Sequence, residues 1–162
     1  MPSDAAEPVL GTNRARADER GDKNFSFERA VLPAFEPDRH FEVVSSCYTL
    51  CYVPEIERAV RSLYDAVEPG GYLLLTYHNE YAQSLFAEMA ERPHEYLDGD
   101  GAWDPDQFAE RFAGVIAGES ILSYRKIHDL LGAWPQSLWS LVEADRYRAW
   151  RQNPVVFVPK PE

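Results

Sequence analysis

The sequence predicts an α/β fold whose mostly parallel sheet ends in a C-terminal antiparallel hairpin. An apolar, strand-like segment at residues 41–46 is followed by a helical pattern and then by a second apolar run at residues 72–77. Strand, helix and strand in this order indicate a parallel sheet. Near the C-terminus, a polar stretch separates two further apolar runs at residues 137–142 and 154–158, as in an antiparallel hairpin.

The composition is that of one globular domain spanning residues 1–162, with 45% hydrophobic residues and a net charge of −11. This charge excludes a general nucleic-acid-binding protein, which needs a basic face to neutralise phosphates. No run approaches the roughly 20 apolar residues of a membrane span, and the first residues lack a secretory pattern. The chain is therefore expected to be cytoplasmic and to have no membrane partner.

Two further features of the composition concern metal binding and habitat. Cys47 and Cys51 have no second Cys or His pair at a zinc-like spacing, so we expect buried thiols and no metal site. Only three of the 16 basic residues are lysine. A halophilic origin and an ordinary acidic protein with a preference for arginine both explain this balance. A melting temperature that rises in molar KCl would favour the halophile.

The N-terminal part is predicted to hold a helix and a short strand. Pro8 suits a first helical turn and Gly21 suits the position after a helix, which gives a helix at residues 8–20. Apolar and polar residues alternate over residues 24–28, the period of a strand. A polar, proline-containing loop at residues 32–40 then leads to the strand at residues 41–46.

The clearest local features are a helix at residues 54–67 and the turn that follows it. Apolar residues line one side of this helix at the helical period: Ile56, Ala59, Val60, Leu63, Tyr64 and Val67. Pro69 is predicted to stop the helix, and Gly70-Gly71 to supply the backbone that reverses the chain. The run 72–77 does not alternate, which predicts a central strand buried on both faces.

Two helices in the second half have clear capping residues. Asn79 is the predicted cap of a helix at residues 80–91, and Ser123 caps a short helix that ends at Leu131-Gly132. Between them, a polar loop precedes a predicted helix at residues 105–118. We expect residues 80–118 to form a helical insert or lid, and residues 119–162 to add the C-terminal helix and the edge strands.

Three stretches, in this order, resemble class I S-adenosylmethionine-dependent methyltransferases, which have a Rossmann-like fold. FEVVSSCYTLCYVPEIERAV is similar to the fourth strand and following helix of that family. LYDAVEPGGYLLLTYHN is similar to its Pro-Gly-Gly turn into the fifth strand, and NRARADERGDKNFSFERAVLPAF to its second helix and third strand. The resemblance covers nearly the whole chain. It implies methyl transfer from S-adenosylmethionine to an unidentified small-molecule acceptor.

One part of the family pattern is missing from the sequence. The family holds the methionine part of its cofactor with a glycine-rich loop after the first strand, where backbone amides must approach the ligand. The one Gly-x-Gly of this chain, Gly99-Asp100-Gly101, does not follow a buried strand. We therefore expect an N-terminally truncated methyltransferase fold whose exposed sheet edge takes a partner strand or forms a homo-oligomer.

The resemblance implies contacts to the cofactor from three places. Asp4, with Glu7 as the lesser candidate, stands where the family has an acid that binds the ribose hydroxyls. Three residues at the end of the predicted strand 24–28 and directly after it match the positions that receive adenine: Glu28, Arg29 and Ala30. Three residues that leave the strand 41–46 match positions beneath the cofactor: Ser46, Cys47 and Tyr48. The alternative is that all of these are solvated, loop or packing residues.

The implied catalytic residue and two of the three implied substrate residues come after the strand at residues 72–77. His78 is the predicted general base, because its pKa near neutrality lets it take a proton from an oxygen or nitrogen acceptor. The predicted substrate residues are Tyr52, Asn79 and Tyr124. The alternatives are a polar residue before a helix cap for His78 and core packing for the aromatic residues.

Two functions from different classes therefore stay open at this point. The first is a small-molecule methyltransferase, or a truncated fragment of one. The second is a non-catalytic methyltransferase-like domain with an interaction or regulatory role, in which the open sheet edge binds a partner. Titration with the cofactor distinguishes them. A nicotinamide-dependent enzyme is disfavoured, because it needs the same missing glycine loop and a catalytic Tyr-x-x-x-Lys or similar pair, which the chain lacks.

Overall fold

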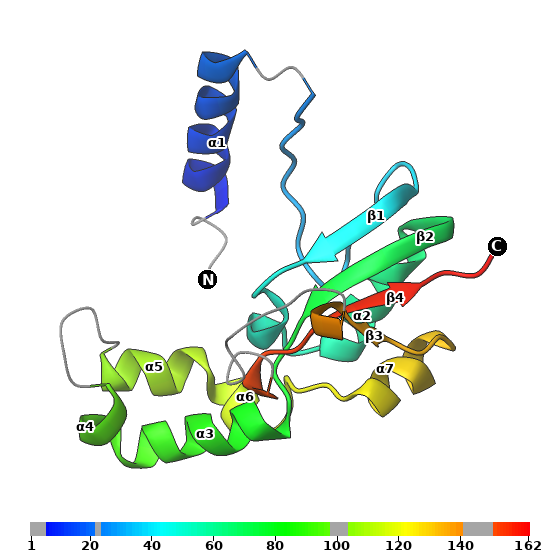
Figure 1. Cartoon of the computed structure of the whole chain (residues 1–162). Helices are drawn as coiled ribbons and strands as arrows, with labels where there is room; N and C mark the ends of the chain where they lie inside the picture. The colour runs from blue at the N-terminus through cyan, green and yellow to red at the C-terminus, as the bar shows by residue number, and fades with distance from the viewer. Residues whose placement is uncertain (1–5, 22–23, 98–103, 141–150) are drawn as a thin grey trace. The chain divides into compact units, whose positions relative to one another are not determined.

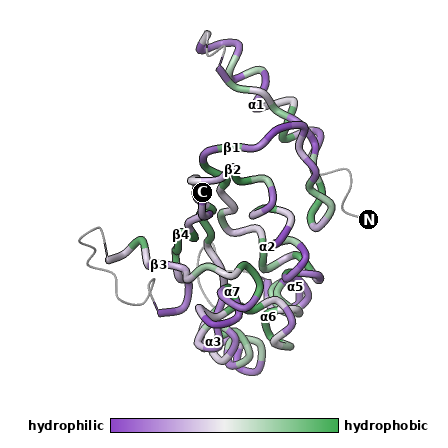
Figure 2. The backbone as a smooth tube through the Cα atoms, turned by 90° about the vertical axis from the view of Figure 1, so that its right-hand side faces the viewer, coloured by the Kyte–Doolittle hydropathy of each residue, from purple (hydrophilic) through white to green (hydrophobic). Residues whose placement is uncertain are grey.

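The computed structural model describes residues 6–21, 24–97, 104–140 and 151–162. The chain divides into two units, Met1–Leu32 and Pro33–Glu162. Helix α1, Ala6–Arg20, belongs to the first unit and begins two residues before the predicted start. Figure 2 shows hydrophobic and hydrophilic stretches interleaved along α1, so the helix has no continuous apolar side.

The strand predicted at residues 24–28 does not form. The described residues 24–31 run without helical or strand pairing, and Phe25 is largely exposed. The rings of Phe25 and Phe27, two residues apart, lie 6.3 Å from each other between centroids. The prediction was wrong because alternation sets only which side each residue faces, whereas a strand also needs a neighbour that satisfies its backbone groups.

A four-stranded sheet forms the centre of the unit Pro33–Glu162 (Figure 1). Its strands are β1 (Phe41–Ser46), β2 (Val67–Thr76), β3 (Gln136–Ser137) and β4 (Val155–Pro159), in the order β1-β2-β4-β3. β1 and β2 are parallel and are joined through helix α2, Ile56–Asp65. β4 is antiparallel to both β2 and β3. The predicted α/β fold, with a parallel start and an antiparallel C-terminal part, is confirmed.

The C-terminal hairpin differs from the prediction in its first strand. Only Gln136–Ser137 pairs with β4, and a short 3-10 helix, Leu138–Ser140, follows it at once. The remaining two residues of the predicted strand, 141 and 142, lie outside the described residues. β4 is also an interior strand, because it lies between β2 and β3.

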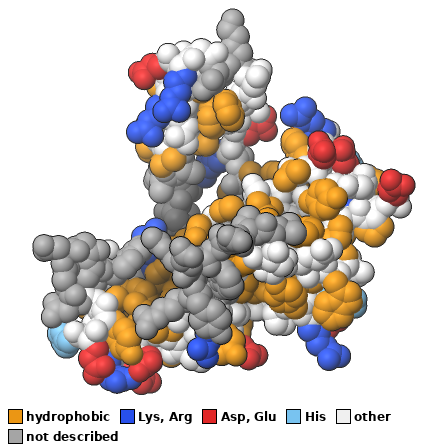
Figure 3. All heavy atoms as spheres, viewed as in Figure 1, with side chains coloured by type: hydrophobic (Ala, Val, Ile, Leu, Met, Phe, Trp, Pro, Cys, Tyr) orange, Lys and Arg blue, Asp and Glu red, His pale blue; other side chains and the backbone are white. Residues whose placement is uncertain are grey.

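The sheet is fully buried on one face only. Leu73 and Leu75 of β2 have no exposed surface, and α2 packs against this strand. On the other face, Tyr72 is 44% exposed and its neighbour across the strands, Val43, is 57% exposed. Figure 3 shows hydrophobic side chains gathered over the sheet on one face of the molecule. The interior position of β2 is thus confirmed, whereas its predicted burial on both faces is wrong.

The turn between α2 and the sheet is built differently from the prediction. α2 ends at Asp65, so Pro69 does not stop it, and β2 already begins at Val67. Phe41 pairs with Val67 and Val43 with Tyr72, so β2 bulges between these pairs. Gly70 lies in this bulge with φ +83°, a backbone conformation that favours glycine. The left-handed glycine therefore belongs to a bulge inside the strand and not to the end of the helix.

The described residues of this unit also form a short 3-10 helix, Leu50–Tyr52, and five further α-helices: α3 (Glu80–Glu91), α4 (Pro93–Tyr96), α5 (Pro105–Arg111), α6 (Ala113–Ile116) and α7 (Tyr124–Leu131). α3 and α7 have the predicted bounds. The side chain of Asn79 accepts hydrogen bonds from the first turn of α3, and Ser123 does the same for α7. The helix predicted at residues 105–118 is instead two short helices that break at Phe112.

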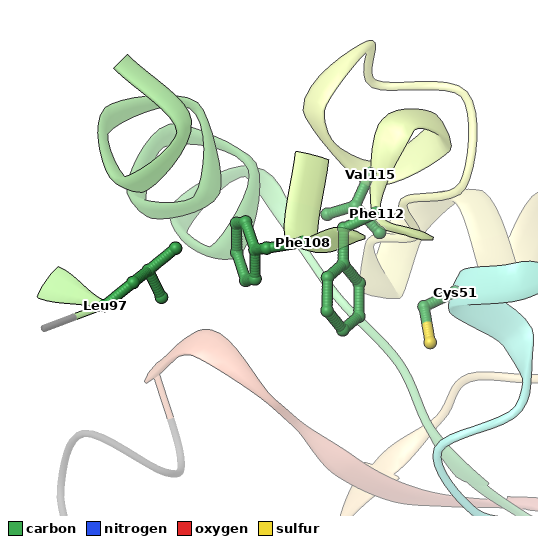
Figure 4. Packing of buried hydrophobic residues seen from close by; sticks show 5 residues of the cluster. All are labelled: Cys51, Leu97, Phe108, Phe112 and Val115. Atoms are coloured by element: carbon green, nitrogen blue, oxygen red, sulfur yellow. The ribbon is translucent and has the colours of Figure 1, made fainter. Parts of the chain in front are cut away.

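Buried hydrophobic side chains hold these helices to the residues after β1. Leu97, Phe108, Phe112 and Val115 form a cluster with Cys51. Figure 4 shows the rings of Phe108 and Phe112 between Leu97 on one side and Cys51 on the other. The cluster explains the break at Phe112, because α5 and α6 both direct side chains into it.

Candidate functional site

The carboxyl ends of β1 and β2 meet at one edge of the sheet, because the two strands are parallel. A hydrogen bond joins the turn after β1 to the end of β2: the Tyr48 N–H donates to Oγ1 of Thr76, at 2.6 Å. Thr76 is the last residue of β2 and is only 5% exposed. In open α/β sheets, ligands bind at this edge. The residues around this pair are therefore the candidates for a ligand-binding site.

The turn after β1 holds Tyr48 in an uncommon conformation. Its φ is 56°, which is sparsely populated for a residue with a bulky side chain. The thiol of Cys51 donates to the Tyr48 carbonyl at 3.6 Å, and the Thr49 hydroxyl donates to the Cys47 carbonyl at 3.1 Å. The Tyr48 side chain itself is 62% exposed. The main chain of Tyr48 is thus fixed on both sides while its ring faces solvent.

The two residues before Tyr48 lie on opposite faces of the strand end. Ser46 is buried, and its hydroxyl oxygen has no hydrogen-bond partner in the described part of the chain. Cys47 is exposed, whereas Cys51 is buried and its pKa is raised, mainly by burial. The expectation of two buried thiols is therefore correct for Cys51 and wrong for Cys47, which directly precedes the Tyr48 turn.

His78 lies two residues beyond Thr76 and contacts the aromatic side chains of the helices. Its ring centroid is 5.1 Å from that of Phe86 and 6.3 Å from that of Phe112. Burial among these rings lowers the pKa of His78 below its ordinary value of 6.5. The imidazole is consequently neutral at pH 7, the form that accepts a proton.

The three predicted substrate residues occupy different surroundings. The ring of Tyr52 lies tilted against that of Phe112 with centroids 5.7 Å apart, so it shares this neighbour with His78. Asn79 uses its amide to cap α3 and also donates to the Arg151 carbonyl at 2.6 Å. Tyr124 is the first residue of α7 and remains partly exposed. Of the three, Tyr52 is the one that shares an aromatic neighbour with the predicted base.

The remaining predicted cofactor residues belong to the N-terminal unit. Glu28, Arg29 and Ala30 are exposed residues of its extended segment. Glu7 forms an ion pair with Arg14 at 3.1 Å. Asp4 lies outside the described residues. Their predicted roles stay predictions.

Thr76 is the residue of this edge that the sequence analysis missed. A threonine at the end of an apolar strand gives no local signal, because its partner is the Tyr48 amide, 28 residues away. A weak clue was available: Thr76 is the first polar residue after the run Leu73-Leu74-Leu75.

Within the described ranges, no three or more His, Cys, Asp or Glu side chains are grouped so that they could hold a metal ion. None of the described helices is long and apolar enough to span a membrane.

The sequence model of a family described as "Methyltransferase domain" matches residues 3–131, which is most of the chain. The chain belongs to this methyltransferase family. Class I methyltransferases use S-adenosylmethionine as their methyl donor, so the predicted family and cofactor are confirmed at the level of the family. No curated protein sequence matches the chain.

The fold of this methyltransferase-family chain is similar to a solved structure titled "The structure of PKMT2 from Rickettsia typhi in complex with AdoHcy". The TM-score is 0.57 at 9% sequence identity, and the match covers 97% of this chain but 44% of the other. The chain thus spans less than half the length of that protein. At this identity the similarity supports the fold alone.

The residues at the carboxyl end of β1 are candidates for contacts to one side of the family's cofactor. Tyr48 offers an exposed ring, and Ser46 contributes a buried hydroxyl without a protein partner. A buried polar atom in this state calls for a functional or solvent-related explanation. The glycine-rich loop for the other side has no counterpart in the sequence, since the one Gly-x-Gly, residues 99–101, does not follow a predicted buried strand and lies outside the described residues.

Ser46→Ala is expected to stabilise the free protein and to weaken cofactor binding. Removing an unpaired buried hydroxyl should raise the free energy of unfolding by about 1 kcal/mol. The same change removes a candidate polar contact, so affinity for S-adenosylhomocysteine should fall severalfold. Urea unfolding and calorimetry check the two effects. Lower stability together with unchanged affinity would contradict both.

Proposed function

We propose that the chain binds S-adenosylmethionine at the carboxyl ends of β1 and β2 and transfers its methyl group to a small-molecule acceptor. The observation that carries this proposal is the Tyr48–Thr76 hydrogen bond, which joins the two strand ends and leaves the Tyr48 ring exposed. The solved complex of PKMT2 with AdoHcy, the demethylated form of this donor, supports the choice of cofactor.

Ser46, Cys47 and Tyr48 contact the cofactor in this proposal. When bound, the cofactor supplies a methyl group on a positively charged sulfonium, which is ready for in-line displacement. The protein then has to position the reactants and exclude water. The exposed tyrosine ring suits stacking on a flat adenine, since aromatic faces bind bases without needing a specific hydrogen-bond pattern.

His78 acts as the general base toward the acceptor. A ring nitrogen of the neutral imidazole takes the proton that an acceptor hydroxyl or amine loses when it forms its new bond to carbon. Burial beside Phe86 and Phe112 keeps His78 unprotonated at pH 7, so it is available for this step. Tyr52, which shares Phe112 with His78, lines the acceptor side.

Calorimetric titration of the full chain with S-adenosylhomocysteine tests the cofactor part. Binding is expected, and Tyr48→Ala should weaken it about tenfold, within the range for loss of one stacking aromatic. Tyr96→Ala is a matched control, because Tyr96 is also an exposed tyrosine but ends α4. Equal affinity of the wild type and the Tyr48 variant would contradict the assigned role, and no binding by the wild type would overturn the proposal.

The His78 environment predicts a pH dependence of stability. A histidine whose pKa is lower in the folded state binds a proton more weakly there than in the unfolded state, so protonation favours unfolding. Stability is therefore retained above the ordinary pKa of 6.5 and falls as the pH drops below it. The variant His78→Gln should lose this part of the pH dependence while it still binds S-adenosylhomocysteine. Parallel urea titrations at pH 7.5 and 5.5 check this, and an unchanged pH dependence in the variant would contradict it.

A second candidate function is a non-catalytic, methyltransferase-like interaction or regulatory domain. It is favoured by the partly exposed sheet face around Val43 and Tyr72, and by the fact that β1 has a single strand partner, β2, among the described strands. Such an edge can pair with a strand of another copy or of a partner. Sedimentation of the chain together with the cofactor titration separates the two candidates. Self-association without any cofactor binding would favour the second.

A further inference from the structure

We propose that Thr76 is a positioning residue, whose hydroxyl holds the Tyr48 turn in the conformation that presents the tyrosine ring to the cofactor. This inference rests on the proposed function and adds to it a residue that contacts neither cofactor nor acceptor. Thr76 acts through Tyr48 by one hydrogen bond, from the Tyr48 N–H to Oγ1 at 2.6 Å.

The first step of the argument is the conformation of Tyr48. A non-glycine residue at φ 56° is strained, and strain of this kind persists only where the surroundings enforce it. Strained residues cluster at functional sites, where they hold a group ready for a ligand. The Tyr48 side chain is exposed, so burial of its ring does not compensate for the strain. The compensation must come from the hydrogen bonds of its main chain.

The second step concerns which of these bonds ties the turn to the sheet. Cys51 and Thr49 bond to the carbonyls of Tyr48 and Cys47, but both belong to the turn itself. Thr76 comes from a different strand. It is buried, and it pairs with Val155 of β4 on the side of β2 away from β1. The hydroxyl of Thr76 is therefore a fixed acceptor, and the turn is placed relative to the sheet through it.

The third step links Thr76 to the reaction. His78 follows Thr76 by two residues along the same chain, and its main-chain carbonyl accepts the Leu122 N–H at 2.9 Å. One strand end thus carries both the anchor for the predicted cofactor contact and the predicted base. Fixing the Tyr48 turn to this strand end sets the distance between Tyr48 and His78. Such preorganisation lowers the ordering cost that binding would otherwise carry.

The experiment is a double-mutant cycle on the full chain, read by S-adenosylhomocysteine affinity. Thr76→Val keeps the β-branched shape but removes the acceptor oxygen, and Thr76→Ser keeps the oxygen. We expect affinity to fall about tenfold in Thr76→Val and to stay within about threefold in Thr76→Ser. In a Tyr48→Ala background, Thr76→Val should change affinity less than about twofold, because residues that act as one unit are not additive.

A second readout needs no ligand. Hydrogen exchange at the Tyr48 amide should be slow in the wild type and in Thr76→Ser, and faster in Thr76→Val. Fast exchange of this amide in the folded wild type would overturn the proposal, even if Thr76→Val failed to fold. A merely structural Thr76 would weaken binding equally with and without the Tyr48 ring, and such additivity would also overturn it. Absence of binding by the wild type would instead overturn the proposed function, and this inference with it.

Discussion

Gly71→Ala is expected to destabilise the protein by about 3 kcal/mol, the upper end of the cost of overpacking a well-packed site. A β carbon at this position would lie 2.5 Å from the Glu42 carbonyl oxygen, 2.9 Å from Cγ1 of Val67 and 3.0 Å from the Glu68 carbonyl oxygen. Two of these three atoms are main chain, so no side-chain rotation relieves the clash. β1 and β2 would have to separate at the bulge that starts their parallel pairing.

The neighbouring glycine is a matched control. Gly70 needs a positive φ of 83°, but its nearest neighbour would lie 3.9 Å from an added β carbon. Gly70→Ala should therefore cost only the strain of the left-handed backbone, about 1–2 kcal/mol. Urea unfolding of both variants distinguishes the steric clash of an added β carbon from the strain of a left-handed backbone. If Gly71→Ala loses no more stability than Gly70→Ala, the close approach does not govern this turn.

Lys160→Met is expected to lower the free energy of unfolding by about 2 kcal/mol, as for loss of hydrogen bonds from a charged group. The Lys160 ammonium donates to the carbonyls of Tyr64 at 3.1 Å, Asp65 at 3.2 Å and Val67 at 2.7 Å. The Tyr64 and Asp65 carbonyls belong to the last two residues of α2, where a positive charge also interacts favourably with the helix dipole, and the Val67 carbonyl belongs to the first residue of β2. Methionine keeps the apolar stem but leaves the carbonyls without this donor.

A second lysine supplies the control for this prediction. Lys126 forms an ion pair with Glu57 at 3.1 Å, with both side chains at least one-third exposed. Exposed pairs contribute at most about 1 kcal/mol, so Lys126→Met should have a small effect that disappears at high salt. The effect of Lys160→Met should remain in 1 M NaCl, because its partners are neutral carbonyls. Equal losses in the two variants, measured by urea unfolding, would contradict the assigned contacts.

The elements that were predicted correctly are those with a complete local signal. β1, Phe41–Ser46, and α3, Glu80–Glu91, have the predicted bounds. Asn79 and Ser123 cap their helices through side-chain oxygens that bond to amides two or three residues away. Capping depends only on residues within one turn, so it can be predicted from the sequence. The family resemblance likewise rested on short stretches that follow one another along the chain.

The errors arise where a distant partner decides the outcome. Residues 24–28 alternate like a strand but have no strand partner within the described part of the chain. β2 is apolar on both faces, yet only the face of Leu73 and Leu75 is fully buried, whereas Tyr72 on the other face is 44% exposed. Pro69 was predicted to stop the helix before β2. The carbonyls around the end of α2 instead accept hydrogen bonds from Lys160, more than 90 residues later. None of these partners can be read from neighbouring residues.

The same division applies to the candidate site. From sequence alone, Ser46, Cys47, Tyr48 and His78 were placed at the carboxyl ends of two parallel strands, because strand ends and turn residues carry local signals. Only the tertiary structure showed that Tyr48 has a positive φ and donates its N–H to Thr76, and that burial of His78 beside aromatic rings lowers its pKa. Local order along the chain sets the elements. Hydrogen bonds and burial between distant segments set the conformation and protonation of the candidate site residues.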